Sequence, residues 1–108
     1  MNQEALHELV DGIISIMKER VISIVLYGSV ARGTNTDDSD VDIAILVRSA
    51  LNNELDDALS DFVVDMNLKH DRVFSVIDID YDTFRSWEKA IPYYRNVNEE
   101  GIVLWTAA

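Results

Sequence analysis

The stretch VISIVLYGSVARGTNTDDSDVDIAILV, residues 21–47, contains two apolar runs separated by a polar loop. Both runs, Val21–Tyr27 and Val41–Val47, are short and rich in β-branched residues, which is typical of buried strands. A glycine follows the first run, and two aspartates, Asp40 and Asp42, stand at the opening of the second. The stretch therefore predicts two strands of a sheet with carboxylates at the mouth of one of them.

Helical patterns flank the two strands. The apolar residues before the first strand share spacings of three and four: Leu6, Leu9, Val10, Ile13, Ile14 and Met17. A second set with these spacings follows the second strand: Leu51, Leu55, Ala58, Leu59, Phe62, Val63 and Met66. Each set forms one apolar stripe on a helix, so we expect both helices to pack against the sheet.

The C-terminal third predicts further elements. Val73–Ile79 has the composition of a third strand, and Ile102–Trp105 that of an edge strand. Thr83–Ala90 suits a helix that ends at Ile91–Pro92, because proline disfavours a helical conformation in the residue before it. The expected fold class is α/β (α+β), with a small mixed β-sheet flanked by helices.

Length and composition limit the function classes. A chain of 108 residues with 48% hydrophobic residues predicts one domain, residues 1–108, around a single core. The formal charge of -11 argues against direct binding to nucleic acid or to an anionic membrane. The chain has no Cys, which excludes thiolate zinc sites, and no apolar run near the ~20 residues that span a bilayer. We expect a soluble, cytoplasmic protein.

The spacing of Asp40 and Asp42 has a chemical meaning. Residues two apart on a strand project from the same face, with side-chain origins roughly 6–7 Å apart. Two carboxylates in this arrangement can share magnesium, which prefers oxygen ligands and keeps water and substrate phosphates in its shell. Two such ions support in-line displacement at phosphorus, so the pair favours nucleotidyl transfer. A structural role for Asp42 alone is less favoured, because an unpaired carboxylate in an apolar strand is costly.

Gly28 and Ser29 form a complementary signal directly after the first strand. Glycine lets the backbone approach an anion, and the Ser hydroxyl with nearby amides can hold phosphate oxygens. Arg32 would add a cation for the nucleotide or pair with the acidic loop. A Gly-Ser pair alone is more often a turn, but its position ten residues before an Asp-x-Asp is far more specific.

The order Gly28–Gly33 followed by Ser39–Asp42 resembles the signature of the DNA polymerase β-like nucleotidyltransferase superfamily, in the compact form called minimal nucleotidyltransferase (MNT). The motif covers the sixteen residues from Tyr27 to Asp42, and the order of elements over most of the chain agrees with the family core. The segment Tyr93–Ile102 is also similar to the C-terminal end of many such proteins, and its spacing alone predicts a helix, a turn at Gly101 and a strand. The resemblance implies a polymerase β-like fold and transfer of a nucleoside monophosphate with magnesium.

The resemblance also implies partners and residue roles. Stand-alone MNT domains are often antitoxins encoded beside a HEPN ribonuclease toxin, which they bind and can AMPylate on tyrosine. We expect AMP transfer from ATP to a protein hydroxyl within a hetero-oligomer. Gly28 and Ser29 would hold the triphosphate, and Asp40 and Asp42 would bind two Mg²⁺ ions. The alternative is a catalytically degenerate acidic module that neutralises a basic toxin by binding alone.

The residue that supplies the third carboxylate of the family site is not determined by the motif. It usually lies on the strand after the intervening helix, facing the Asp-x-Asp pair, and here that strand offers Ser75, Asp78 and Asp80. Because an odd separation reverses side-chain direction, Ser75 and Asp78 lie on opposite faces. We predict Asp78 as the third catalytic and metal-binding residue. The alternatives are that Ser75 occupies this place, or that Asp80 or no residue supplies the third carboxylate.

Overall fold

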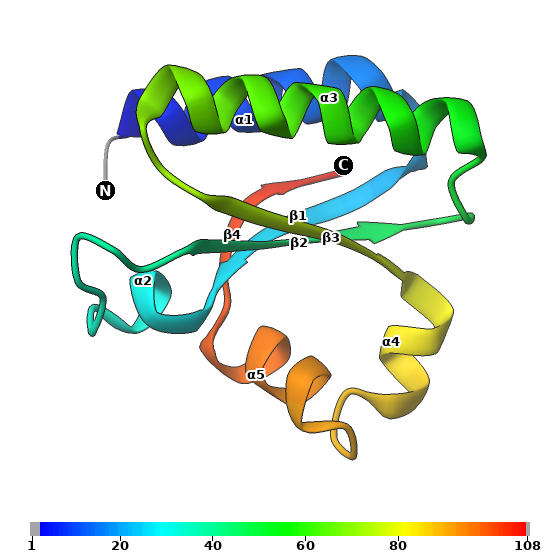
Figure 1. The fold of residues 1–108 in the computed structure, drawn as a ribbon. Coiled ribbons are helices and arrows are strands. Elements are labelled where there is room, and N and C mark those ends of the chain that lie inside the picture. Colours follow the sequence, from blue (N-terminus) through cyan, green and yellow to red (C-terminus); the bar gives the residue numbers. More distant parts are fainter. Residues whose placement is uncertain (1–2, 108) are drawn as a thin grey trace.

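The computed structural model describes residues 3–107, apart from the side chain of Tyr93, as a four-stranded sheet with helices on both faces (Figure 1). The elements are α1 (Gln3–Met17), the 3₁₀ turn η1 (Lys18–Arg20), β1 (Val21–Tyr27), α2 (Gly28–Arg32), β2 (Val41–Val47), α3 (Asn53–His70), β3 (Phe74–Asp80), α4 (Tyr81–Trp87), α5 (Pro92–Glu100) and β4 (Ile102–Thr106). None of the helices in the described part is long and apolar enough to cross a membrane.

The strand order β3-β2-β1-β4 makes the sheet mixed, which confirms the predicted fold class. β1 is antiparallel to both of its neighbours, whereas β2 and β3 run parallel. A parallel pair needs a crossover, and the long helix α3 provides it. As a result, the C-terminal end of β1 lies beside the N-terminal ends of β2 and β3, at one end of the strands.

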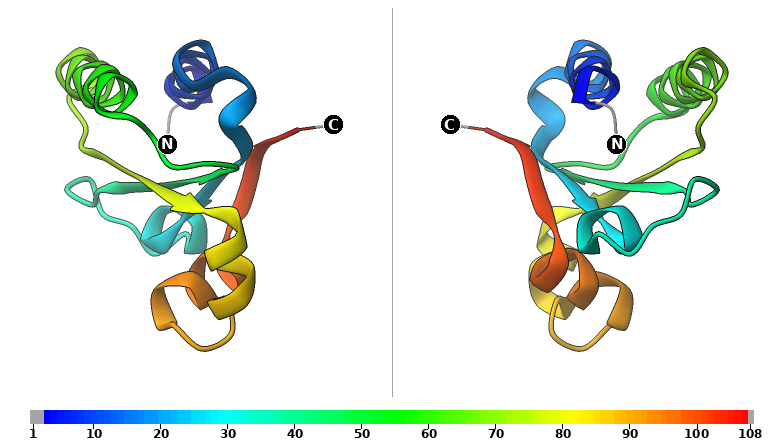
Figure 2. Two further views of the ribbon diagram at one scale, coloured as in Figure 1. Left: turned by 90° about the vertical axis from the view of Figure 1, so that its right-hand side faces the viewer. Right: turned by 90° about the vertical axis from the view of Figure 1, so that its left-hand side faces the viewer.

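Two apolar layers sandwich the sheet. α1 and α3 cover one face, and α4 and α5 lie against the other (Figure 2). Alternate side chains of β2 serve the two layers: Ile43 and Ile45 face α1 and α3, while Ala44 and Leu46 face the opposite layer. Because this central strand is buried on both sides, its sequence is continuously apolar instead of alternating.

The helices of the first layer approach each other closely at Gly12. A side chain added there would run into the ring of Phe62 on α3, so the glycine that weakens α1 locally also permits the packing. Leu9 and Ile13, which flank this contact, are fully buried. Burial of each such side chain contributes about 1.5–3 kcal/mol, which is more than the propensity cost of one glycine.

The region after β3 differs from the prediction. The helix expected over residues 83–90 is α4, which begins two residues earlier and ends at Trp87, and the helix expected after Pro92 is α5. Asp80 caps α4 by accepting a hydrogen bond from the Thr83 amide at 3.0 Å. Pro92 occupies the first turn of α5, where the missing amide hydrogen carries no cost. Pro92 thus begins α5, whereas α4 has already ended at Trp87.

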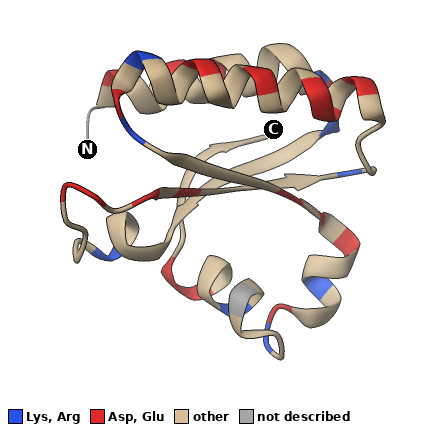
Figure 3. Ribbon diagram, viewed as in Figure 1, with Lys and Arg blue, Asp and Glu red and all other residues tan. Residues whose placement is uncertain are grey.

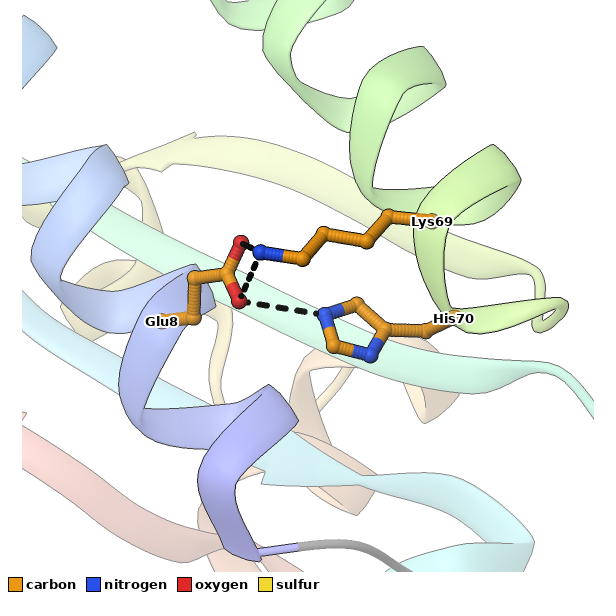
Figure 4. Close-up of polar contacts among 3 residues, drawn as sticks. All are labelled: Glu8, Lys69 and His70. Atoms are coloured by element: carbon orange, nitrogen blue, oxygen red, sulfur yellow. Dashed lines mark hydrogen bonds and ion pairs between the residues drawn. The ribbon is translucent and has the colours of Figure 1, made fainter.

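A polar contact joins α1 to the end of α3 (Figure 4). Glu8 accepts a hydrogen bond from Lys69 Nζ at 2.9 Å and lies 3.2 Å from His70 Nε2. The hydrogen bond from Lys69 is the main reason why the pKa of Glu8 lies below its usual 4.5. A lowered carboxyl pKa stabilises the fold above the unfolded-state pKa, and this stabilisation is lost as pH falls through the folded-state value.

Replacing Glu8 with Gln should therefore flatten the acid side of the stability profile. We expect the melting temperature of Glu8→Gln to decline less steeply than that of wild type on acidification below about pH 4.5. Asp11→Asn, which changes an exposed carboxylate on the same helix, is the control. Identical acid slopes for wild type and Glu8→Gln in melts from pH 6 to pH 3 would contradict the assignment.

Candidate active site

The turn after β1 brings the backbone against a carboxylate. Gly28 has φ 76, a left-handed conformation that favours glycine, and it begins the short helix α2. A Cβ atom added to Gly28 would overlap Oδ2 of Asp42 and lie 3.1 Å from its Cγ. The first amides of a helix have no carbonyl partner within it, so the start of α2 leaves backbone N–H groups free of helical bonds next to Asp42.

Asp42 lies at the centre of the site. It pairs with Tyr27 across the antiparallel strands and is half-buried, whereas Asp40 is exposed just before β2 begins. Burial raises the pKa of Asp42 first, the charge of Asp40 raises it further, and the charge of Arg32 opposes both. The structure therefore brings Gly28, Asp40 and Asp42 together, as the sequence motif predicts.

The loop before Asp40 is held by contacts that sequence patterns do not reveal. Ser39 Oγ accepts a hydrogen bond from the Thr36 amide at 2.9 Å, which closes a turn within the loop. Arg72, after α3, donates from Nη2 to the Ser39 carbonyl at 3.3 Å, and the Val41 amide bonds to the Val73 carbonyl at 2.8 Å. These bonds anchor the loop to the start of β3, and no local signal around Arg72 points to such a role.

Arg32 makes a pairing of its own. Its Nη1 lies 2.8 Å from Glu100 Oε2, so it joins the last turn of α2 to the end of α5. Both side chains are partly exposed, and the contribution of such a pair to folding stability is small. Of the two expected roles, pairing with an acid is the one observed, although the acid belongs to α5 and not to the loop. The charge of Arg32 still acts on Asp42.

The strand register corrects the expectation for Asp78. In the parallel pair, Asp42 lies beside Ser75, whereas Asp78 lies beside Ile45, whose side chain belongs to the opposite layer. Asp78 is exposed, and Asp80 caps α4, so neither joins the pair. Because side chains alternate along a strand, the odd separation from Ser75 places Asp78 on the other face.

Ser75 instead occupies the position that faces the site. Within residues 3–107 the structure contains no cluster of three or more His, Asp or Glu side chains arranged to hold a metal. The candidate metal donors are thus the carboxylates of Asp40 and Asp42. Burial and the charge of Asp40 disfavour the charged form of Asp42. A hard divalent cation fits such a pair, because it would relieve their repulsion and complete its shell with water or phosphate oxygens.

The effect of Asp40 and Arg32 on the pKa of Asp42 can be measured directly. In the metal-free protein, Asp40→Asn should lower the pKa of Asp42, because it removes a neighbouring negative charge. Arg32→Ala should raise the pKa of Asp42, because it removes a positive one. An NMR titration of the Asp42 carboxyl carbon tests both directions. The same pKa in wild type and both variants would show that the three groups do not interact.

Comparison with known proteins agrees with this geometry. A family model described as a nucleotidyltransferase domain matches residues 10–100. A Methanocaldococcus jannaschii protein named "Putative protein adenylyltransferase MJ0604" is 34% identical over 113 residues, which cover 97% of this chain and 100% of that protein. The matched region contains α2, both aspartates and all of β3.

Solved structures show the same fold. A crystal structure of a toxin–antitoxin with AMP-PNP aligns with a TM-score of 0.66 and 23% identity, over 99% of this chain and 75% of that one. A Shewanella oneidensis complex of a tri-AMPylated HEPN toxin with an MNT antitoxin aligns with a TM-score of 0.62 and 19% identity, over 99% and 74% of the two chains. The likeness confirms the polymerase β-like nucleotidyltransferase architecture.

Proposed function

Because this chain belongs to the nucleotidyltransferase domain family, we propose that it transfers AMP from ATP to a hydroxyl group of a protein, with magnesium. The observation that supports this proposal best is the placement of the half-buried Asp42 against Gly28 and beside Asp40. A carboxylate whose pKa is raised and which faces a turn of backbone amides suits a site for cations and phosphates. The relative named as an adenylyltransferase supports the protein acceptor.

The proposed roles follow from these positions. Asp40 and Asp42 would hold Mg²⁺, which supplies positive charge at the reacting phosphate when bound. Gly28 and Ser29 bind triphosphate oxygens through backbone amides and the Ser hydroxyl. The acceptor oxygen forms a bond to the α-phosphorus, the bond to the bridging oxygen breaks, and pyrophosphate leaves. Since no described third carboxylate faces the pair, the hydroxyl proton passes to water.

We further propose a HEPN toxin as the acceptor and partner. Solved structures with this fold are toxin–antitoxin complexes, one of them with an AMPylated HEPN toxin. A formal charge of -11 also suits a partner that carries basic surface for RNA. The resulting assembly is a hetero-oligomer of the two proteins.

A binding-only role is the second candidate, and the register of β3 is the observation that favours it. With Ser75 in the position beside Asp42, the site has two carboxylates, whereas nucleotidyl transfer in this family usually uses three. Such a protein would neutralise the toxin through its acidic surface without modifying it.

Labelled ATP separates the two candidates. The protein is incubated with Mg²⁺, α-phosphate-labelled ATP and a HEPN protein as the proposed acceptor, and label on the HEPN protein is measured. We expect transfer that depends on Asp42 and stops when EDTA removes the metal. Tight binding without transfer under these conditions would overturn the enzymatic proposal and leave the binding module.

The facing position on β3 provides a gain-of-function prediction. Ser75→Asp places a carboxylate beside Asp42, so it should strengthen magnesium binding and raise transfer severalfold. Asp78→Asn, on the opposite face, should leave transfer unchanged. The measurements are the magnesium dependence of the initial rate and a calorimetric titration. A loss of activity in Asp78→Asn with no effect of Ser75→Asp would show that the other face carries the site.

A further inference from the structure

Aliphatic side chains are exposed along the end of α3 and in the connection to β3. Leu68 is 78% exposed, Val64 one turn earlier is 55% exposed, and Val73 is 53% exposed. Leu68 and Val64 share one side of the helix because they are four residues apart. Single exposed aliphatic residues are common, but a run of them on one surface points to a contact with another molecule.

This aliphatic run borders the loop that leads to Asp40. Leu68 and Val73 line a shallow hollow of about 270 Å³ whose far side is formed by Asp37, Asp38 and Ser39. In Figure 1 the loop after α2 and the connection from α3 to β3 lie at the same end of the sheet. A molecule seated here would contact the loop up to Ser39, the residue before Asp40.

The rim of the surface is acidic. Asp61 and Asp65 are exposed and lie three residues before Val64 and Leu68 respectively, and Asp71 lines the hollow together with the two loop aspartates. Figure 3 shows acidic positions along α3 and in the loop. One cation lines the hollow, Arg72, and its guanidinium is already bonded to the Ser39 carbonyl.

We propose that this surface, formed by Val64, Leu68 and Val73 with Asp61, Asp65 and Asp71, docks a cationic amphipathic segment of the acceptor protein. The inference rests on the proposed transfer to a protein and adds how that acceptor is recognised. Aliphatic side chains of the segment cover Leu68 and Val73, and its Lys and Arg residues meet the surrounding carboxylates. Docking at the hollow holds the acceptor protein against the loop that leads to Asp40.

Charge decides between this partner and a second copy of the chain. In a symmetric dimer through this surface, the aspartates of one copy would face those of the other, which costs free energy by like-charge repulsion. A cationic partner, in contrast, is attracted by the same aspartates. The surface therefore suits a basic protein better than self-association.

The aliphatic contribution is tested by Leu68→Arg, with Val103→Arg as its matched control. Both side chains are exposed, and Val103 lies on β4 at the other edge of the sheet. Calorimetry with the HEPN protein, without ATP, should show binding weakened about tenfold or more for Leu68→Arg only. The KM for the HEPN protein should rise in the same proportion, while affinity for ATP stays at the wild-type value.

The acidic rim is tested by the double variant Asp61→Lys/Asp65→Lys, with Asp11→Lys on α1 as control. The double variant should bind the HEPN protein more weakly and with a smaller dependence on salt. Wild-type affinity in both Leu68→Arg and the double variant would overturn the docking surface. So would sedimentation showing a wild-type dimer that Leu68→Arg dissociates, because a second copy would then be the occupant.

The outcomes for docking and for catalysis are separable. Binding that depends on Leu68 without any AMP transfer would overturn the proposed reaction and leave the docking surface standing. Transfer that is indifferent to Leu68→Arg would leave the reaction standing and overturn the docking surface.

Discussion

Asp42→Asn is expected to lower AMP transfer by more than about 100-fold while the protein remains folded. Loss of groups that only orient metal ligands costs about 10–100-fold in metal affinity or activity, so loss of a ligand itself should cost at least as much. The fold should gain stability at neutral pH, because burial and Asp40 disfavour the charged form of Asp42 and raise its pKa. The amide removes that charge without removing volume.

Melting curves and initial rates test this prediction together. Without metal, Asp42→Asn should melt at a higher temperature than wild type near pH 7, and the difference should shrink as pH falls through the raised pKa of Asp42. Addition of Mg²⁺ should stabilise wild type and leave the variant unchanged. Asp78→Asn, which also neutralises a carboxylate but on the opposite face, is the control. If Mg²⁺ stabilises Asp42→Asn and wild type equally, Asp42 does not bind the metal.

Gly28→Ala is expected to have the second largest effect, on both stability and transfer. The residue has φ 76, and a left-handed conformation costs a non-glycine residue about 1–2 kcal/mol. The added methyl group would also overlap the carboxylate of Asp42, with 3.1 Å to its Cγ and 3.3 Å to its Cβ. To avoid this contact Asp42 must move, so ATP binding and transfer should fall well beyond the loss of stability.

Gly33→Ala is the matched control. Gly33 has φ 74, nearly the same conformation, but within the described residues a Cβ there meets no atom within 4 Å. Both variants should therefore show a similar conformational cost in urea unfolding, and only Gly28→Ala should show an additional loss together with impaired ATP binding. If the two variants behave alike in both measurements, Gly28 serves the turn and not the site.

Much of the fold could be predicted from local patterns. The apolar runs of β1 and β2 and the stripes of α1 and α3 are visible in the sequence, because burial of one face requires apolar residues at the period of the element. The first part of the site was equally visible. Gly28 with Ser29 and Asp40 with Asp42 flank a single loop, so the adjacency of the two strands was enough to bring them together.

Contacts between distant segments could not be predicted in this way. Arg32 and Glu100 are separated by 68 residues, and nothing near either one indicates the other. Arg72 likewise reaches the loop carbonyl of Ser39 only because α3 returns the chain to the start of β3. The start of α4 depends on the cap at Asp80, which accepts a hydrogen bond from the Thr83 amide.

The composition of β3 determined that it is a strand, and its period of two determined that Ser75 and Asp78 lie on opposite faces. Only the tertiary structure decided which of them meets Asp42. Side-chain alternation is a property of one strand, whereas the face that it turns toward a neighbour depends on the register of their hydrogen bonds. That register is set by burial of Phe74 and Val76 under α1 and α3, which turns Ser75 toward Asp42 and leaves Asp78 in solvent on the other side.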